Sequence, residues 1–527
     1  MTDDFAGLPN YDVLAAGEPE KRRKPATWWV VGGAAVAVAA LIGGITYGVA
    51  SLSGGGTQPE GALPAGAIAF AKVDLDPAAG QKVDAIRFLR KFPSLRGRVT
   101  QDADLRKVLF DAVADDAGWK SVSFAKDVEP WLGDRVGVAA YAPTAFGQGG
   151  TADKPGAPTV VVALQVGDES KARAGLDALI AKSKGPSKPG YVVQDGYALL
   201  TESTALAKSV ADGVAKGTLA KAKTFAADVG GLDDSIATFW VDGAAASSVM
   251  SVADLYGAGL PTAAGAGVGA GKKNLALAGS RVVFSLRFDG PDVLELAGNI
   301  KAGTKITDPN VPLKDFAKLP STTVAAIGLG GGDSLVDHAW KGIGEGIDKS
   351  QGADSFDNAV RQVESQFGLK LPADLKLLLG SNMLIALDSS GLAQSKIAAG
   401  ARVTTTDGKR ANALIGRLTQ GIENTPIGVP KLIHRATGDG YILASSAAQA
   451  ARMTQPSGKT LGDNPAFRRA LPDLAGARYA IWLDVQGLVG PFIGSAPADL
   501  KPIAGFGVTS SSDGNGGGSF RARLVTR

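Results

Sequence analysis

The sequence predicts an α+β protein in which a single N-terminal transmembrane helix precedes two tandem repeats, each with largely antiparallel sheets flanked by helices. Three observations carry this prediction: a long uncharged apolar run, a series of similar segments that recurs in the same order in both halves of the chain, and Asp-Gly turns between strand-like runs. A chain of 527 residues is too long for one ordinary domain. Its 45% hydrophobic and 20% charged residues are typical of a globular protein with buried cores.

The apolar run, WWVVGGAAVAVAALIGGITYGVASL, covers residues 28–52 and contains no charged side chain. As a helix it would be roughly 37 Å long at about 1.5 Å per residue, enough to cross a hydrocarbon core of about 30 Å with some tilt. Trp28 and Trp29 open it, where indole rings favour the headgroup region. A cleavable signal peptide is the alternative, because small residues occupy 48–50, but the run exceeds the usual apolar core of about 7–15 residues. We therefore expect an uncleaved signal anchor.

The residues around this run predict its orientation. Four basic residues precede it, whereas residues 53–58 carry no charge. The basic residues are Lys21, Arg22, Arg23 and Lys24. The positive-inside bias places the N-terminus in the cytoplasm and the bulk of the chain outside the cell membrane.

A row of small residues inside the run, Ala40, Gly44 and Gly48, has the spacing of helix–helix contacts in membranes. In a Gly/Ala-rich span the same row also arises by chance, so a contact and an incidental row both remain open.

The outer region reads as one plan used twice. Six pairs of similar segments occur in one order: 63–76 with 319–332, 109–118 with 355–368, 128–141 with 375–388, 191–203 with 434–446, 233–243 with 476–487, and 281–290 with 518–527. Loop insertions account for the drift in their spacing, and the shared order predicts an internal duplication.

Together these features divide the chain into six parts. They are a disordered cytoplasmic tail (1–27), the transmembrane helix (28–52), a linker (53–62), repeat one (63–300), a connector (301–318) and repeat two (319–527). Asp195-Gly196 and Asp439-Gly440 each lie between two strand-like runs and each precede a tyrosine, which predicts hairpins and therefore antiparallel pairing.

The composition excludes several kinds of chemistry. The chain has no Cys, only two His and a net charge of +4. We therefore expect no metal, no cofactor, no catalytic residue that the sequence identifies, and no nucleic-acid partner. His338 and His434 are not at equivalent positions of the two repeats, so we expect them to form no shared site. Ser123-x-x-Lys126 is read as a chance match to the pattern of penicillin-recognising enzymes, because the accompanying motifs are missing.

One pair of residues recurs in both halves. Trp240 with Asp242, and Trp482 with Asp484, each occupy a strand-like run. They would form a ligand platform in a functional interpretation, or a core anchor followed by a helix cap in a structural one. The structural interpretation is favoured.

The segments LPAGAIAFAKVDLDP, LGDRVGVAAY, TFWVDG and AIWLDV, which follow the predicted anchor, give the chain a resemblance to a known group. It resembles the actinobacterial family catalogued as domain of unknown function 3352. The resemblance implies a membrane-tethered envelope protein and supplies no activity, cofactor or catalytic residue.

The leading functional prediction is a non-catalytic binding or scaffolding module of the cell envelope, tethered to the bilayer, with an envelope protein or polymer as ligand. The alternative is an envelope hydrolase or transferase that uses paired carboxylates. Its candidate residues are Asp74, Asp76, Asp134 and Glu129. A cleft with two carboxylates and no basic partner would favour catalysis, and a cleft lined by apolar and hydroxyl groups would favour binding.

Overall fold

The computed structural model of the protein describes only part of the chain. The described residues are 57–74, 79–96, 106–107, 110, 122–147, 158–182, 188–246, 279–303, 307, 310–394, 397–423, 432–454, 458–490 and 497–527. The predicted tail (1–27) and transmembrane helix (28–52), with their basic, tryptophan and small-residue positions, lie outside this part. Within it, no helix combines the length and apolar character needed to span a bilayer.

The strands confirm an α+β fold with antiparallel pairing, and they join into one sheet of 16 strands rather than a separate sheet in each repeat. The first half supplies β1 (Ala67–Asp74), β2 (Leu132–Tyr141), β3 (Thr159–Val166), β4 (Gly190–Gln194), β5 (Tyr197–Thr201), β6 (Ala237–Asp242), β7 (Arg281–Phe288) and β8 (Val293–Lys301). The second half supplies β9 (Thr323–Gly330), β10 (Asn382–Asp388), β11 (Ala398–Thr404), β12 (Ile433–Thr437), β13 (Gly440–Ala444), β14 (Tyr479–Asp484), β15 (Ile503–Ser512) and β16 (Gly518–Thr526).

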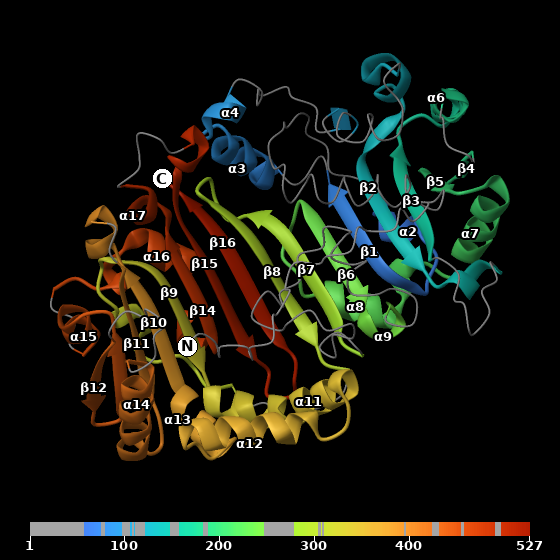
Figure 1. Cartoon of the computed structure of the whole chain (residues 1–527). Helices are drawn as coiled ribbons and strands as arrows, with labels where there is room; N and C mark the ends of the chain where they lie inside the picture. The colour runs from blue at the N-terminus through green and yellow to red at the C-terminus, as the bar shows by residue number, and fades with distance from the viewer. Residues whose placement is uncertain are drawn as a thin grey trace, which may run out of the picture.

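The strand order is the same in both halves when each is read from its outer edge inward. It runs β4-β5-β3-β2-β1-β6-β7-β8 in the first half and β12-β13-β11-β10-β9-β14-β15-β16 in the second. The last strands, β8 and β16, pair antiparallel and make the sheet continuous (Figure 1). The two halves are therefore related by an approximate two-fold axis through this central pair.

The pairing register locates that axis. Trp240 pairs with Val283, which pairs with Asn299, and in the second half Trp482 pairs with Gly507, which pairs with Arg523. Asn299 and Arg523 are thus counterparts, and so are the residues two positions earlier, Ala297 and Arg521. These two are directly paired across β8 and β16. The approximate axis passes between them.

The register also corrects one of the predicted segment pairs. Four of the first five pairs contain strands that are counterparts by topology: β1 with β9, β2 with β10, β4 and β5 with β12 and β13, and β6 with β14. The second pair contains α12 (Ser355–Phe367) in the second half, and only Phe110 of its first-half segment lies within the described part. In the sixth pair, segment 281–290 is β7, whose counterpart by topology is β15 and not β16 (518–527). Both segments alternate apolar and polar residues, and alternation alone does not separate one strand from its neighbour.

The hairpin prediction is confirmed in the first half and shifted by one residue in the second. Asp195 and Gly196 form the β4–β5 turn with φ of 51° and 77°. The β12–β13 turn consists of residues 438 and 439, so Gly440 already belongs to β13. Because side chains alternate between the faces of a sheet, Tyr197 and Tyr441 point to opposite faces. They are not counterparts, and they join different cores.

Helices cover both faces. They are α2 (Pro59–Ala62), α3 (Ala79–Leu89), α4 (Pro93–Arg96), α6 (Glu169–Lys182), α7 (Thr204–Lys216), α8 (Lys223–Val229), α9 (Gly243–Ala246), α11 (Gly332–Gln351), α12 (Ser355–Phe367), α13 (Ala373–Leu379), α14 (Gly408–Glu423), α15 (Ala447–Thr454), α16 (Pro465–Ala470) and α17 (Val485–Val489). Shorter turns are η1 (Phe124–Val128), η2 (Pro143–Phe146), η3 (Leu219–Lys221), η4 (Phe316–Lys318), η5 (Ser389–Gln394), η6 (Leu461–Asp463), η7 (Leu474–Gly476) and η9 (Ala498–Leu500).

We call the face of the sheet that carries both recurring tryptophans the tryptophan face. Trp240 is 3% exposed and packs edge-on against Phe225 of α8 at 5.4 Å between ring centres. Trp482 is fully buried and packs the same way against Phe467 of α16 at 5.3 Å. Each tryptophan therefore anchors a core.

The aspartate that follows each tryptophan is a cap. Asp242 accepts hydrogen bonds from the backbone N–H groups of Ala244 and Ala245, and Asp484 accepts one from Gly487. The structural interpretation of this repeated pattern is confirmed.

Both repeats begin earlier than the sequence predicts. The linker was expected to reach residue 62, but Pro59–Ala62 form α2, and the Tyr197 hydroxyl donates a hydrogen bond to the Thr57 carbonyl at 2.7 Å. In the connector 301–318, β8 reaches Lys301 and Phe316 is 2% exposed within the second core. In each half, a short helical turn packs against the core before the first strand begins. This turn is α2 before β1 in the first half and the turn at Phe316–Lys318 before β9 in the second half.

We expect Trp482→Ala to lower the free energy of unfolding by about 3–5 kcal/mol, because it leaves a large cavity beneath α16. Denaturant unfolding followed by circular dichroism measures this. Trp340→Ala, on the partly exposed α11, is the matched control and should cost less than half as much. Equal losses would contradict the anchoring role.

Candidate functional site

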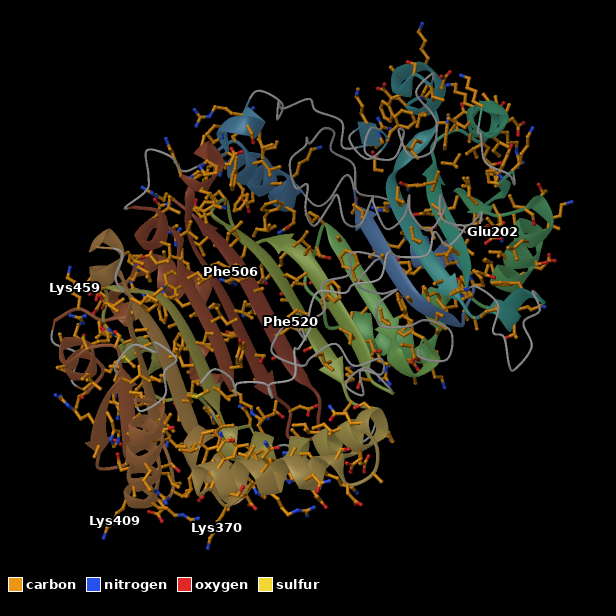
Figure 2. The ribbon with its side chains drawn as sticks, viewed as in Figure 1. Glu202, Lys370, Lys409, Lys459, Phe506 and Phe520 are labelled. Carbon is orange, nitrogen blue, oxygen red and sulfur yellow. The ribbon has the colours of Figure 1, made fainter. Side chains whose placement is uncertain are left out.

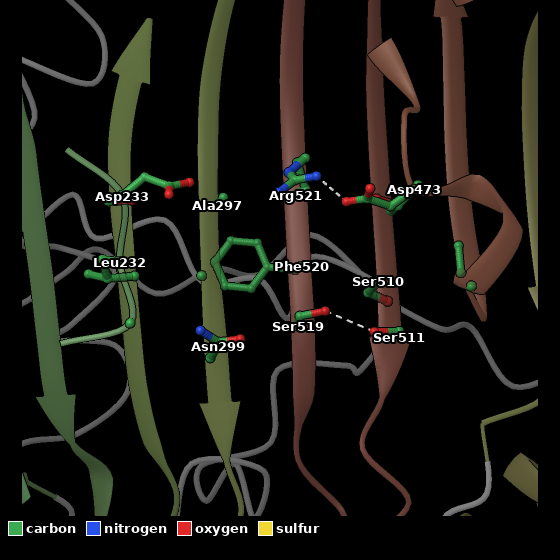
Figure 3. Close-up of a pocket in the computed structure, with 16 residues that line it drawn as sticks. Leu232, Asp233, Ala297, Asn299, Asp473, Ser510, Ser511, Ser519, Phe520 and Arg521 are labelled. Carbon is green, nitrogen blue, oxygen red and sulfur yellow. Dashed lines mark hydrogen bonds and ion pairs between the residues drawn. The ribbon is translucent and has the colours of Figure 1, made fainter. Parts of the chain in front are cut away.

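A hollow of about 290 Å³ lies on the tryptophan face at the approximate two-fold axis (Figure 3). Strands β7, β8, β16 and β15 form its floor, and the segments that lead into β6 and β14 form its walls. The lining residues are Gly231, Leu232, Asp233, Ser285, Ala297, Gly298, Asn299, Asp473, Gly476, Ala477, Thr509, Ser510, Ser511, Ser519, Phe520 and Arg521. Both halves therefore contribute equivalent elements to one site.

One row of paired residues crosses the floor. Ser285 pairs with Ala297, Ala297 with Arg521, and Arg521 with Thr509. Paired residues on neighbouring strands point to the same face, so these four side chains share the floor. Ser285 and Thr509 are counterparts about the axis, whereas Ala297 faces Arg521.

The rows on either side of this central row are counterparts that have diverged. On one side the row is ionic and consists of Arg287, Glu295 and Arg523. On the other side the equivalent positions hold Ser511, Ser519 and Asn299. The hollow occupies the side with the small polar residues, where the Ser511 and Ser519 hydroxyls lie 2.8 Å apart. The sheet is therefore filled on one side of the axis and open on the other.

The ionic row centres on Glu295, which is fully buried. Its carboxylate lies 2.7 Å from Nε of Arg287, 2.5 Å from Nη2 of Arg523 and 3.1 Å from Nε of Arg521. Arg523 also contacts Asp289 at 2.6 Å. Burial, the largest single effect, disfavours the charged form of Arg287. The hydrogen bond to Glu295 and the negative charges of Glu295, Asp233 and Asp289 together outweigh burial and raise the pKa of Arg287, which therefore stays ionised.

The two carboxylates that line the hollow both have arginine partners. Asp233 lies 3.1 Å from Nη1 of Arg287, and Asp473 contacts Nη1 of Arg521. Their side chains are 67% and 60% exposed. Neither is a carboxylate held without a basic partner, which is the arrangement that acid–base catalysis would require here.

Two hydroxyl residues of the floor occupy counterpart positions on opposite sides of the axis. Ser285 is 3% exposed and Thr509 is 4% exposed, and both line the hollow. Neither hydroxyl oxygen is among the described side-chain atoms that are buried without a hydrogen-bond partner. Both hydroxyls are therefore open to the hollow.

A second buried carboxylate, Asp228, serves the first core. It is 3% exposed and accepts hydrogen bonds from Nε1 of Trp240 at 2.9 Å and Nε of Arg281 at 2.7 Å. Burial raises its pKa, but the hydrogen bonds from Arg281, Trp240 and Lys301 outweigh this and hold the pKa of Asp228 below its usual value. It fixes the tryptophan rather than lining the hollow.

The described carboxylates among those proposed for catalysis, which are Asp74, Asp134 and Glu129, do not line the hollow. Asp74 lies 3.3 Å from Nε of Arg135, and Asp134 lies 3.9 Å from Nε of Arg106. Glu129 is exposed, and Asp76 lies outside the described residues.

The remaining sequence motifs are structural. Ser123 precedes η1, and its backbone N–H bonds to Asp127. His338 on α11 contacts two backbone carbonyls, and His434 on β12 contacts Asn412. In the described part of the chain, no three His, Asp or Glu side chains are grouped to hold a metal ion.

The fold and the hollow define a class: an α+β protein whose two equal halves share one antiparallel sheet and a polar site at the junction. Residues 30–194 match a family described as "Protein of unknown function (DUF3352)". That match starts inside the predicted transmembrane run and ends at the last residue of β4, so it covers less of the chain than the predicted resemblance. No curated protein and no solved structure matches the chain.

We expect Glu295→Ala to destabilise the protein by about 3–5 kcal/mol, because it leaves the arginines at the junction without their buried counter-charge. Chemical denaturation measures the change. Asp473→Ala removes an exposed partner of Arg521 and should cost about 1 kcal/mol or less. A Glu295→Ala loss as small as that of the control would show that the cluster does not hold the junction.

Proposed function

We propose that this protein is a non-catalytic binding or scaffolding module of the cell envelope, and that the hollow between its halves is the binding site. The observation that carries the proposal is the lining of the hollow. It presents hydroxyl and amide groups, and its two carboxylates are neutralised by arginine. A cleft lined by hydroxyl groups favours binding, whereas a cleft with two carboxylates and no basic partner would favour catalysis.

The catalytic alternative has no structural support among the described residues. A general acid or base has to reach a reacting atom in a defined ionisation state. Asp233 and Asp473 are each in contact with an arginine, and the other described candidate carboxylates do not line the hollow. A binding role needs only complementary shape and hydrogen bonding.

We further propose that residues 28–52 hold the protein in the cell membrane as an uncleaved anchor, with Lys21–Lys24 and the N-terminus in the cytoplasm. The tandem repeats then lie outside the cell, near the outer face of the bilayer. Because packing begins by Thr57, the chain from residue 52 to 57 reaches at most about 18 Å. The first repeat would therefore lie close to the bilayer, within reach of envelope proteins and polymers.

The absence of cysteine gives a direct test of this topology. Lys409 is exposed at the start of α14 (Figure 2), and we expect Lys409→Cys to react with a membrane-impermeant maleimide on intact cells. Asp12→Cys should react only after permeabilisation. Labelling that is confined to lysed cells for both variants would overturn the placement, and a chain shortened by about 50 residues would indicate cleavage.

Photocrosslinking tests the binding role. We expect p-benzoylphenylalanine at position 511, inside the hollow, to form an irradiation-dependent adduct with an envelope component in living cells. The same residue at position 409, on the far part of the second half, is the control. Adducts that are absent at 511, or equal at the two positions, would contradict the assignment of the hollow as the binding site.

A further inference from the structure

We infer that the ligand of the hollow is an uncharged, hydroxyl-rich molecule, and specifically a neutral sugar unit of an envelope glycan. This inference rests on the proposed binding function and names the class of molecule that the site accepts. It follows from the charge balance of the site, from the hydroxyls that are open to it and from its size.

The charges around the hollow are already paired with one another. The three arginines are Arg287, Arg521 and Arg523, and the four carboxylates that contact them are Asp233, Asp289, Glu295 and Asp473. An anionic ligand would have to compete with carboxylates for Arg521, and a cationic ligand would compete with arginines for Asp233 or Asp473. Drawing Arg521 away from the fully buried Glu295 is costly. At the exposed Asp233 or Asp473, a cationic ligand would only replace one ion pair by another and would gain little. The site therefore selects against charged ligands.

The groups that remain free to bind are neutral. Ser285 and Thr509 present hydroxyls, and Asn299 presents an amide. Among the described residues, none of these three side chains is bound to another side chain. A hydroxyl both donates and accepts, and an amide does the same through its two ends. Sugar hydroxyls, which also both donate and accept, match this set. An apolar molecule would leave the two hydroxyls unpaired.

The divergence of the two halves created the space. On the filled side of the axis the ionic row occupies the sheet surface. On the open side its counterparts Ser511, Ser519 and Asn299 are too short to do so. A volume of about 290 Å³ is just below the roughly 300–1,000 Å³ range of ligand sites. The hollow therefore takes one or two sugar rings and not a long polymer segment.

The test uses the full-length protein in detergent, with defined sugars as probes. Glucose, N-acetylglucosamine and maltose are the neutral probes, and glucuronic acid and glucosamine are the charged ones. Saturation-transfer NMR detects binding, and calorimetry gives affinities. We expect at least one neutral probe to bind more tightly than both charged probes.

Two variants locate the binding. The double variant Ser285→Ala with Thr509→Val removes both hydroxyls and nearly preserves the shape of the site. We expect it to lower the affinity for the neutral probe at least about five-fold, because one or two hydrogen bonds to the ligand are lost. Thr204→Val, on the exposed first turn of α7, should leave the affinity unchanged. Unfolding curves on both confirm that they fold.

The outcomes separate the two claims. Preferential binding of a charged probe, or neutral binding that the double variant does not weaken, would overturn the sugar inference. Failure of every probe, together with a crosslink at position 511, would overturn the sugar inference and leave the binding function in place. Failure of every probe without that crosslink would overturn both.

Discussion

The architecture depends on the antiparallel pairing of β8 with β16. Without it, each half would end in a long unpaired strand, and an exposed edge of that kind invites association with other chains. The pairing converts two edges into the centre of one sheet. It also buries Glu295, whose carboxylate is stable there only because arginines from β7 and β16 surround it. The junction is thus specified by charge as well as by backbone hydrogen bonds, and a register slip would separate Glu295 from its partners.

The candidate site follows from the same junction. An approximate two-fold axis places equivalent residues of the two halves at equal distances from it. Each half therefore contributes one residue to every pair of equivalent positions near the axis. Had both halves kept the ionic row, the sheet surface would be filled on both sides. Because one copy of the row holds serines and asparagine instead, a hollow lies at the point where the walls from both halves converge. The site belongs to neither repeat alone, which explains why no motif within a repeat marks it.

Much of the fold follows from sequence patterns, and the site does not. The Trp-x-Asp pattern marks β6 and β14, because a buried ring and a capping carboxylate need fixed spacing along a strand. The Asp-Gly sequences mark both hairpins within one residue. The sixth segment pair failed because β7 and β16 have the same two-residue period, and β8, with Glu295 between leucines, reads poorly as a buried strand. The hollow needs the β8–β16 register, which local periodicity does not contain. Matching β7 to β15 would have aligned Ala297 with Arg521. That alignment would have shown from sequence alone that the two halves differ at the junction where the hollow lies.

Duplication within a single chain permits what a symmetric dimer forbids. At a true two-fold axis a residue meets its own copy, so an arginine at position 521 would face an identical arginine and the like charges would repel. Here Ala297 stands opposite Arg521, and the arginine turns toward Glu295 and Asp473 instead. The same freedom allows one flank to hold a buried ion cluster and the other to hold hydroxyls. The asymmetry at the axis is therefore the feature that places the hollow on one flank of a nearly symmetric sheet, and it would give the proposed ligand a defined orientation.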